Sequence, residues 1–140
     1  MQMAFARAHR IVAWFILVGT LLQIYLAGGG SFGAVSYDLH RAWGSLLGLP
    51  ILVLAILALA GRIGRRGIGL TMLLLGLYIV QVALPSLRVG LPYIAALHVL
   101  NATALVGVAA ATARASGSAI AARRREPALT ATSTGPERAD

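Results

Sequence analysis

The sequence predicts an all-α protein, a bundle of four transmembrane helices, on three observations. Hydrophobic residues make up 59% of the 140 residues and charged residues only 11%, whereas roughly a quarter of a soluble domain is charged. The mean hydropathy is +0.83. Four apolar runs also approach or reach the roughly 20 residues that a membrane-spanning helix needs. The length suits one domain, and the lack of cysteine excludes disulfides and thiolate metal sites.

The expected helices cover residues 11–27, 39–60, 68–84 and 93–113. We expect the first to be a membrane helix and not a cleaved signal peptide, because its apolar stretch is long and lacks a small-residue cleavage pattern. Pro50 lies inside the second helix and is expected to kink it. Residues 1–115 are predicted to form the transmembrane domain. Residues 116–140 are rich in Ala, Arg, Thr, Ser and Pro and are predicted to be a disordered cytoplasmic tail.

The net charge of +8 comes from arginine alone. These arginines lie between the apolar runs and not on one amphipathic face, so the expected partner is the lipid bilayer and no nucleic acid. Most of them lie before the first helix, in the second loop or after the fourth helix: Arg7, Arg10, Arg62, Arg65, Arg66, Arg114, Arg123, Arg124 and Arg125. The positive-inside rule therefore places both termini in the cytoplasm. His9, beside Arg10, is expected to be a solvated headgroup contact.

Few polar side chains lie within the predicted spans, and such residues are functional candidates by default. His40 and His98 are near the starts of the second and fourth helices, and Gln23 and Gln81 are near the ends of the first and third. Each glutamine precedes its histidine by 17 positions, and a shift of 58 positions superimposes one pair on the other. This spacing predicts a parallel repeat of two helical hairpins, which would place His40 and His98 opposite each other across the bundle.

Two neutral histidines that face each other across a bundle can supply both axial ligands of haem b through their Nε2 atoms. Gly44 and Gly48 follow His40 at intervals of four residues and are expected to leave a groove for the flat macrocycle. Gln23 and Gln81 are expected to accept a hydrogen bond from the Nδ1–H of each ligand. Arg41 is expected to lie near the outer surface, where the haem propionates need a counter-charge.

Other interpretations of the same residues remain open. A non-catalytic membrane subunit or scaffold would use both histidines in interhelical hydrogen bonds and Gly44 and Gly48 in helix packing. A small transporter or quinone-binding module would use Gln23, Gln81 and Asn101 as polar contacts. A zinc site is not expected, because two histidines fall short of the three protein ligands that zinc requires. Ser45 and Thr103 lack a partner oriented by a carboxylate, so an ordinary hydrolase is not expected either.

Two strings carry a resemblance to known proteins. Residues 38–44 read DLHRAWG and residues 96–102 read ALHVLNA, and together they resemble a family of small bacterial four-helix membrane proteins known only as a domain of unknown function. The His-Arg-x-x-Gly string at His40 is also similar to one in haem A synthase, which has two four-helix halves with a pair of haem-ligating histidines each. That resemblance implies that His40 and His98 are axial ligands and that Gly44 is a close-packing position.

The departures from the haem A synthase pattern limit what the resemblance implies. This chain has one histidine pair, and Asp38 is the nearest acid to His40, where the synthase often has an adjacent acid. The resemblance therefore implies haem binding in a bacterial inner membrane, and not haem A synthesis by this chain alone. The expected role is electron transfer or haem handling, with a quinone or a respiratory complex as partner.

Overall fold

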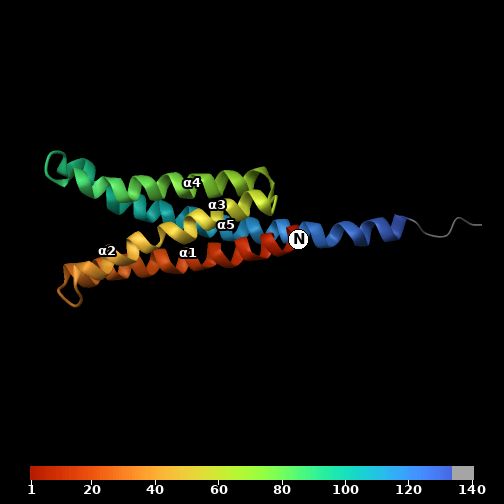
Figure 1. Ribbon diagram of the computed structural model, residues 1–140, viewed down its shortest axis with the longest axis horizontal. Coiled ribbons are helices and arrows are strands. Elements are labelled where there is room, and N and C mark those ends of the chain that lie inside the picture. Colours follow the sequence, from red (N-terminus) through yellow and green to blue (C-terminus); the bar gives the residue numbers. More distant parts are fainter. Residues whose placement is uncertain (134–140) are drawn as a thin grey trace, which may run out of the picture.

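The chain is helical throughout the part that the structure, a computed structural model, describes, which is residues 1–133, with side chains up to Ala122. Its elements are α1 (Gln2–Ser31), α2 (Tyr37–Leu46), α3 (Gly48–Ala60), α4 (Gly64–Ala83), the short 3-10 helix η1 (Leu84–Arg88) and α5 (Pro92–Ser133) (Figure 1). Residues 1–133 include no strand. The prediction of an all-α bundle is therefore confirmed.

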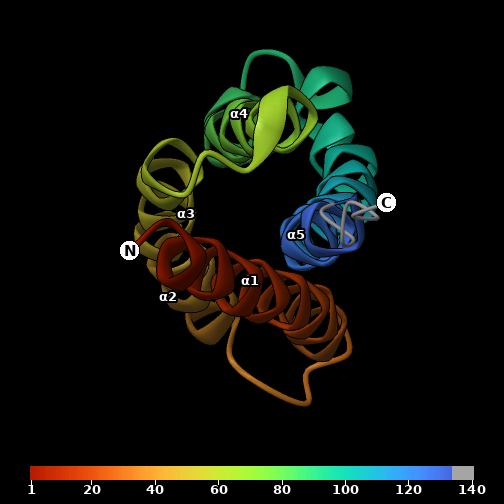
Figure 2. The same ribbon diagram turned by 90° about the vertical axis from the view of Figure 1, so that its right-hand side faces the viewer.

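Four continuous segments are long and apolar enough to cross a membrane: Gln2–Ser31, Tyr37–Ala60, Gly64–Arg88 and Pro92–Ala122. Viewed end-on, they form a closed ring in which α1 and α4 each lie between α3 and α5 (Figure 2). Large apolar side chains cover the outside of this ring; Ile11 and Val99 are 70% and 72% exposed. Contiguous apolar surface of this kind is stable only when lipid covers it. The chain is thus a multi-pass membrane protein.

The second span is broken between α2 and α3, as its proline predicts. Pro50 has no amide hydrogen to donate to the carbonyl of Leu46, and α2 ends at Leu46. In a membrane, the carbonyls freed by such a break must find another donor. The Tyr78 hydroxyl, from α4, donates to two carbonyls in the turn before this break, those of Gly44 and Ser45, at 3.1 and 3.2 Å.

The two hairpins, α1 with α2 and α3, and α4 with η1 and α5, repeat one another in the core. Residues 58 positions apart are buried together in both copies. The pairs are His9 and Gly67, Ala13 and Thr71, Ile16 and Leu74, Leu47 and Leu105, Ile51 and Ala109, Leu54 and Thr112, Ala55 and Ala113, and Ala58 and Ser116. Equal burial at equal spacing along four helices confirms the predicted two-hairpin repeat.

Beyond residue 115, where the tail is expected to begin, α5 continues to Ser133. Ser116 is fully buried, and Ile120 packs with Ala6, Ala58 and Ile63 in a small cluster at this end of the bundle. The composition of the segment suggested disorder, since it contains little apolar area of its own. The apolar surface that orders it belongs to the other helices. Residues 134–140 of the predicted tail lie outside the described residues.

Candidate functional site between two histidines

His40 on α2 and His98 on α5 face each other at the junction of the two hairpins. Their ring centroids are 6.2 Å apart, and the ring planes are inclined by 68°. Both residues are half-buried. The expectation that the repeat brings the two imidazoles together is therefore confirmed, and this contact joins one hairpin to the other.

The Nδ1 atoms of both histidines are held by main-chain carbonyls. His40 Nδ1 is 3.1 Å from the carbonyl oxygen of Gln23, and His98 Nδ1 is 3.0 Å from that of Gln81. A carbonyl oxygen can only accept, so Nδ1 carries the hydrogen in each ring. The neutral imidazole then keeps a lone pair on Nε2. Both rings are thus fixed in the same tautomer by equivalent contacts.

The glutamine side chains contact the opposite nitrogen from the one that the sequence suggested. Gln23 Nε2 lies 3.3 Å from His40 Nε2, and Gln81 Nε2 lies 3.1 Å from His98 Nε2. An amide nitrogen donates, so each side chain donates to the lone pair of its histidine. The pairing of Gln with His is as predicted, but the atoms are corrected. Close approach of the paired helices brings the main-chain carbonyl itself within reach of Nδ1, so the side chain is not needed there.

The two glutamine side chains differ in how the rest of the amide is held. Asn101 Nδ2 donates to the carbonyl of Leu77 at 2.8 Å and to Gln81 Oε1 at 2.7 Å. Gln81 is thereby held at both ends of its amide. In the first hairpin, Gln23 Nε2 also donates to the carbonyl of His40 at 2.9 Å. Gln23 Oε1, however, is buried without a hydrogen-bond partner among the described residues. The two glutamines therefore occupy equivalent positions, but only Gln81 has hydrogen bonds at both its amide oxygen and its amide nitrogen.

A cavity of about 270 Å³ lies between the hairpins around these groups. Its lining includes six of the seven site residues predicted from sequence: Gln23, His40, Arg41, Gly44, Gln81 and His98. The seventh, Gly48, does not line it, because the phenol of Tyr78 packs there. A Cβ on Gly48 would lie 2.7 Å from Tyr78 Oη, and one on Gly44 would lie 2.6 Å from Gln23 Nε2. The expected open groove along the two glycines is thus corrected: side chains fill it.

Arg41 lines the cavity but already has one partner. Its Nη2 donates to Asp38 Oδ1 at 2.7 Å, and the two side chains are 69% and 81% exposed. Ion pairs this exposed contribute little to stability, because water and salt screen them. The guanidinium can therefore exchange Asp38 for another anion at low cost.

A third histidine forms a second polar cluster that the sequence interpretation missed. His9 was expected to contact lipid headgroups, yet it is fully buried. Its Nδ1 is 2.8 Å from Ser116 Oγ and its Nε2 is 3.1 Å from Thr71 Oγ1, so it ties α1 to α5 and α4. Helical spacing carries the signal: His9 precedes Ala13 by four residues and Ile16 by seven, on the face that is buried.

Among the described side chains, up to Ala122, no group of three or more His, Cys, Asp or Glu could bind a metal ion by itself. Comparison with known proteins adds no activity: no curated protein and no solved structure matches this chain. The similarity to haem A synthase therefore stays a prediction. Residues 23–87, from Gln23 through His40 to Gln81, match the family model of a family of unknown function, DUF6220, which confirms the resemblance to such a family.

Proposed function

We propose that this protein binds one haem b between His40 and His98 and uses it in electron transfer or haem handling. One observation carries the proposal: two imidazoles on equivalent helices, both with Nδ1–H bound to a carbonyl, have ring centroids 6.2 Å apart. When bound, haem b would supply a one-electron carrier whose potential depends on its axial ligands and surroundings.

The separation suits a shared metal. A metal–imidazole bond is about 2 Å long, so two imidazoles on opposite sides of one ion have ring centroids roughly 6 Å apart. The observed 6.2 Å agrees with that estimate. The tautomer suits it as well, because a ligating histidine usually donates its other ring N–H to a carbonyl, carboxylate or water, which orients the ring and makes the ligating nitrogen more basic.

The two glutamine amides now occupy the lone pairs that iron would need. Each is a neutral hydrogen bond with a net worth of about 1 kcal/mol, which metal coordination can replace. Gln81 is fastened by Asn101, whereas the Oε1 of Gln23 has no partner to lose. We therefore assign Gln23 as the side chain that moves to admit the macrocycle beside Gly44. Arg41 would turn from Asp38 to a propionate.

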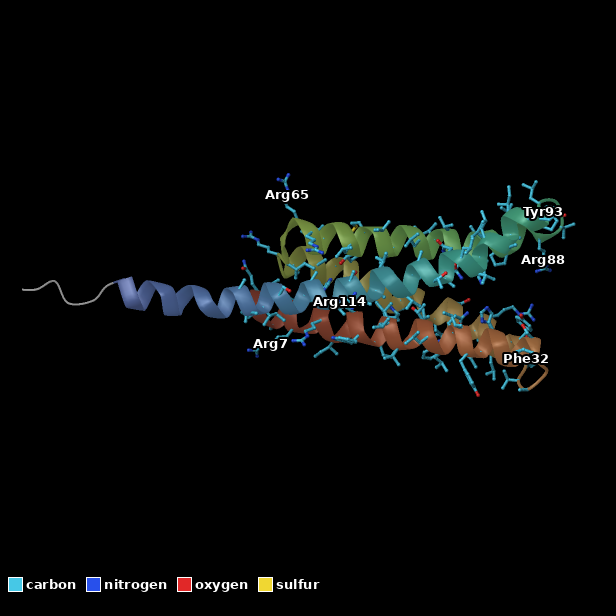
Figure 3. All side chains as sticks on the ribbon, turned by 180° about the vertical axis from the view of Figure 1, so that it is seen from behind. Arg7, Phe32, Arg65, Arg88, Tyr93 and Arg114 are labelled. Carbon is cyan, nitrogen blue, oxygen red and sulfur yellow. The ribbon has the colours of Figure 1, made fainter. Side chains whose placement is uncertain are left out.

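The arginines support an orientation in the membrane. Arg7, Arg65 and Arg114 lie toward one end of the bundle, and Phe32, Arg88 and Tyr93 lie at the other (Figure 3). The positive-inside rule then places the termini in the cytoplasm and the histidines in the outer half of a bacterial inner membrane. An electron partner would approach from the outer side or within the bilayer, where a quinone or a respiratory complex is available.

The test is a reduced-minus-oxidised spectrum of the full chain, purified after expression with ample haem. We expect a b-type spectrum with one haem per chain. His40→Ala and His98→Ala should each abolish it, while His9→Gln, which changes the third histidine, should keep it. Folded wild-type protein without a haem spectrum would overturn the proposal, and so would a spectrum that survives loss of both His40 and His98.

A second candidate is a non-catalytic membrane subunit. It is favoured by the fact that both nitrogens of each imidazole already have hydrogen-bond partners inside the same hairpin. On this alternative, His40→Ala and His98→Ala lower the melting temperature and remove no chromophore, because none is present. The same spectra therefore separate the two candidates.

A further inference from the structure

A groove lies between the start of α4 and the middle of α5, at the opposite end of the bundle from His40 and His98. Its volume is about 490 Å³. It is lined by Ile63, Gly64, Arg65, Arg66, Gly67, Ala111, Arg114, Ala115, Ser118 and Ala119. We call it the arginine groove. Arg65 and Arg114 are seen near this end of the bundle in Figure 3.

The residues that line the arginine groove include three arginines and no acid. The whole chain has four acidic residues, and none of them lies between residues 39 and 125. The ion pair within the described side chains joins Asp38 to Arg41, at the histidine end. Arg65, Arg66 and Arg114 are exposed. Three arginines therefore line one groove, and its lining contains no carboxylate.

Apart from the arginines, the groove is lined mainly by residues with small, apolar side chains. Gly67 and Ala111, Ala115 and Ala119 present little more than backbone and methyl groups, so α4 and α5 leave a channel between them. Both helices belong to membrane spans: Arg65 and Arg66 lie at the start of Gly64–Arg88, and Arg114 lies about two turns before the end of Pro92–Ala122. A ligand that fits must carry negative charge at the membrane surface and hydrocarbon below it.

We infer that the arginine groove binds one anionic phospholipid, with its phosphate between Arg65, Arg66 and Arg114 and an acyl chain that passes Ala111 toward the membrane centre. Guanidinium groups bind phosphate oxygens through paired, charge-assisted hydrogen bonds, which an ammonium cannot do. Basic pockets between transmembrane helices are suited to such headgroups. The inference is independent of haem, because the groove shares no residue with the cavity around the histidines.

The experiment is native mass spectrometry of the full chain in neutral detergent, titrated with dioleoylphosphatidylglycerol and, separately, with dioleoylphosphatidylcholine. The wild type should retain one phosphatidylglycerol in preference to phosphatidylcholine. The double variant Arg65→Gln/Arg114→Gln should bind phosphatidylglycerol roughly tenfold more weakly or worse. The control Arg7→Gln/Arg10→Gln also removes two positive charges at this end of the bundle, but outside the groove. Its affinity for phosphatidylglycerol should stay within about twofold of that of the wild type.

A third variant tests the fit of the lipid in the groove without changing charge. Ser118 is an exposed residue of the groove, so Ser118→Phe should fill the channel and weaken phosphatidylglycerol binding while circular dichroism and melting temperature stay unchanged. The inference is overturned if the wild type shows no preference for phosphatidylglycerol. It is also overturned if the control double variant loses as much binding as the groove variant, since bulk charge then explains it, or if Ser118→Phe binds normally.

Discussion

Trp43 and Asn101 occupy equivalent positions in the two hairpins and donate to equivalent main-chain carbonyls. Trp43 Nε1 donates to Gly19 at 2.8 Å, and Asn101 Nδ2 donates to Leu77 at 2.8 Å. Two different side chains thus make the same contact in the two copies of the repeat. Only Asn101 has a second N–H, which reaches Gln81 Oε1, and this is why Gln81 is satisfied and Gln23 is not.

Asn101→Ala should destabilise the protein more than Trp43→Phe. The first change removes two hydrogen bonds and leaves Gln81 Oε1 without a donor, whereas the second removes one bond and keeps most of the aromatic packing. Hydrogen bonds between membrane helices are worth about 0.6–2 kcal/mol each. Thermal unfolding in detergent should show a larger drop in melting temperature for Asn101→Ala than for Trp43→Phe. An equal or larger effect of Trp43→Phe would contradict the assigned asymmetry.

His9→Ala should lower the free energy of unfolding by about 2–4 kcal/mol, because it opens a cavity and removes the partner that joins Thr71 to Ser116. The neighbouring exposed Arg10→Ala is the control and should change stability by less than about 0.5 kcal/mol. Denaturant or thermal unfolding in the same detergent measures both. If the two substitutions cost the same, His9 is not the buried link that the structure places it to be.

Gly44→Ala should displace Gln23, since the added methyl would lie 2.6 Å from Gln23 Nε2. We expect a loss of stability of roughly 1–3 kcal/mol. Gly76→Ala is the matched control: a Cβ there meets nothing within 4 Å, so higher helix propensity should leave stability unchanged or raise it by up to about 1 kcal/mol.

The double variant Gly44→Ala/Gln23→Ala checks the cause. Removing the amide makes room for the methyl, so the double variant should lose less stability than the sum of the single losses. Strictly additive losses in thermal unfolding would show that the methyl on Gly44 clashes with something other than Gln23.

Tyr78→Phe should cost about 1–2 kcal/mol, because the carbonyls of Gly44 and Ser45 lose the hydroxyl that donates to them at the helix break. The loss should be smaller in a Pro50→Ala background, where the restored amide can donate to Leu46 and a continuous helix brings the amides of Gly48 and Leu49 to the carbonyls of Gly44 and Ser45. Stability measurements on the four proteins of this cycle give the coupling. Zero coupling would mean that Tyr78 acts by packing against Gly48 alone.

The sequence by itself determined the four spans, the break at Pro50 and the meeting of His40 with His98. Each depends on local properties: hydropathy over about 20 residues, the missing amide of proline, and a spacing of 58 residues that two copies of one hairpin must share. These signals are readable without knowing which helices pack together.

Only the tertiary structure decided which atoms meet. The buried place of His9 depends on Thr71 and Ser116, which are 62 and 107 residues away. Tyr78, about 30 residues from Gly48, fills the groove beside that glycine. Beyond residue 115, α5 packs against apolar surface that α1 and α3 supply. The physical reason is the same in each case: a side chain is buried or satisfied by partners on other helices, and the local sequence does not reveal them.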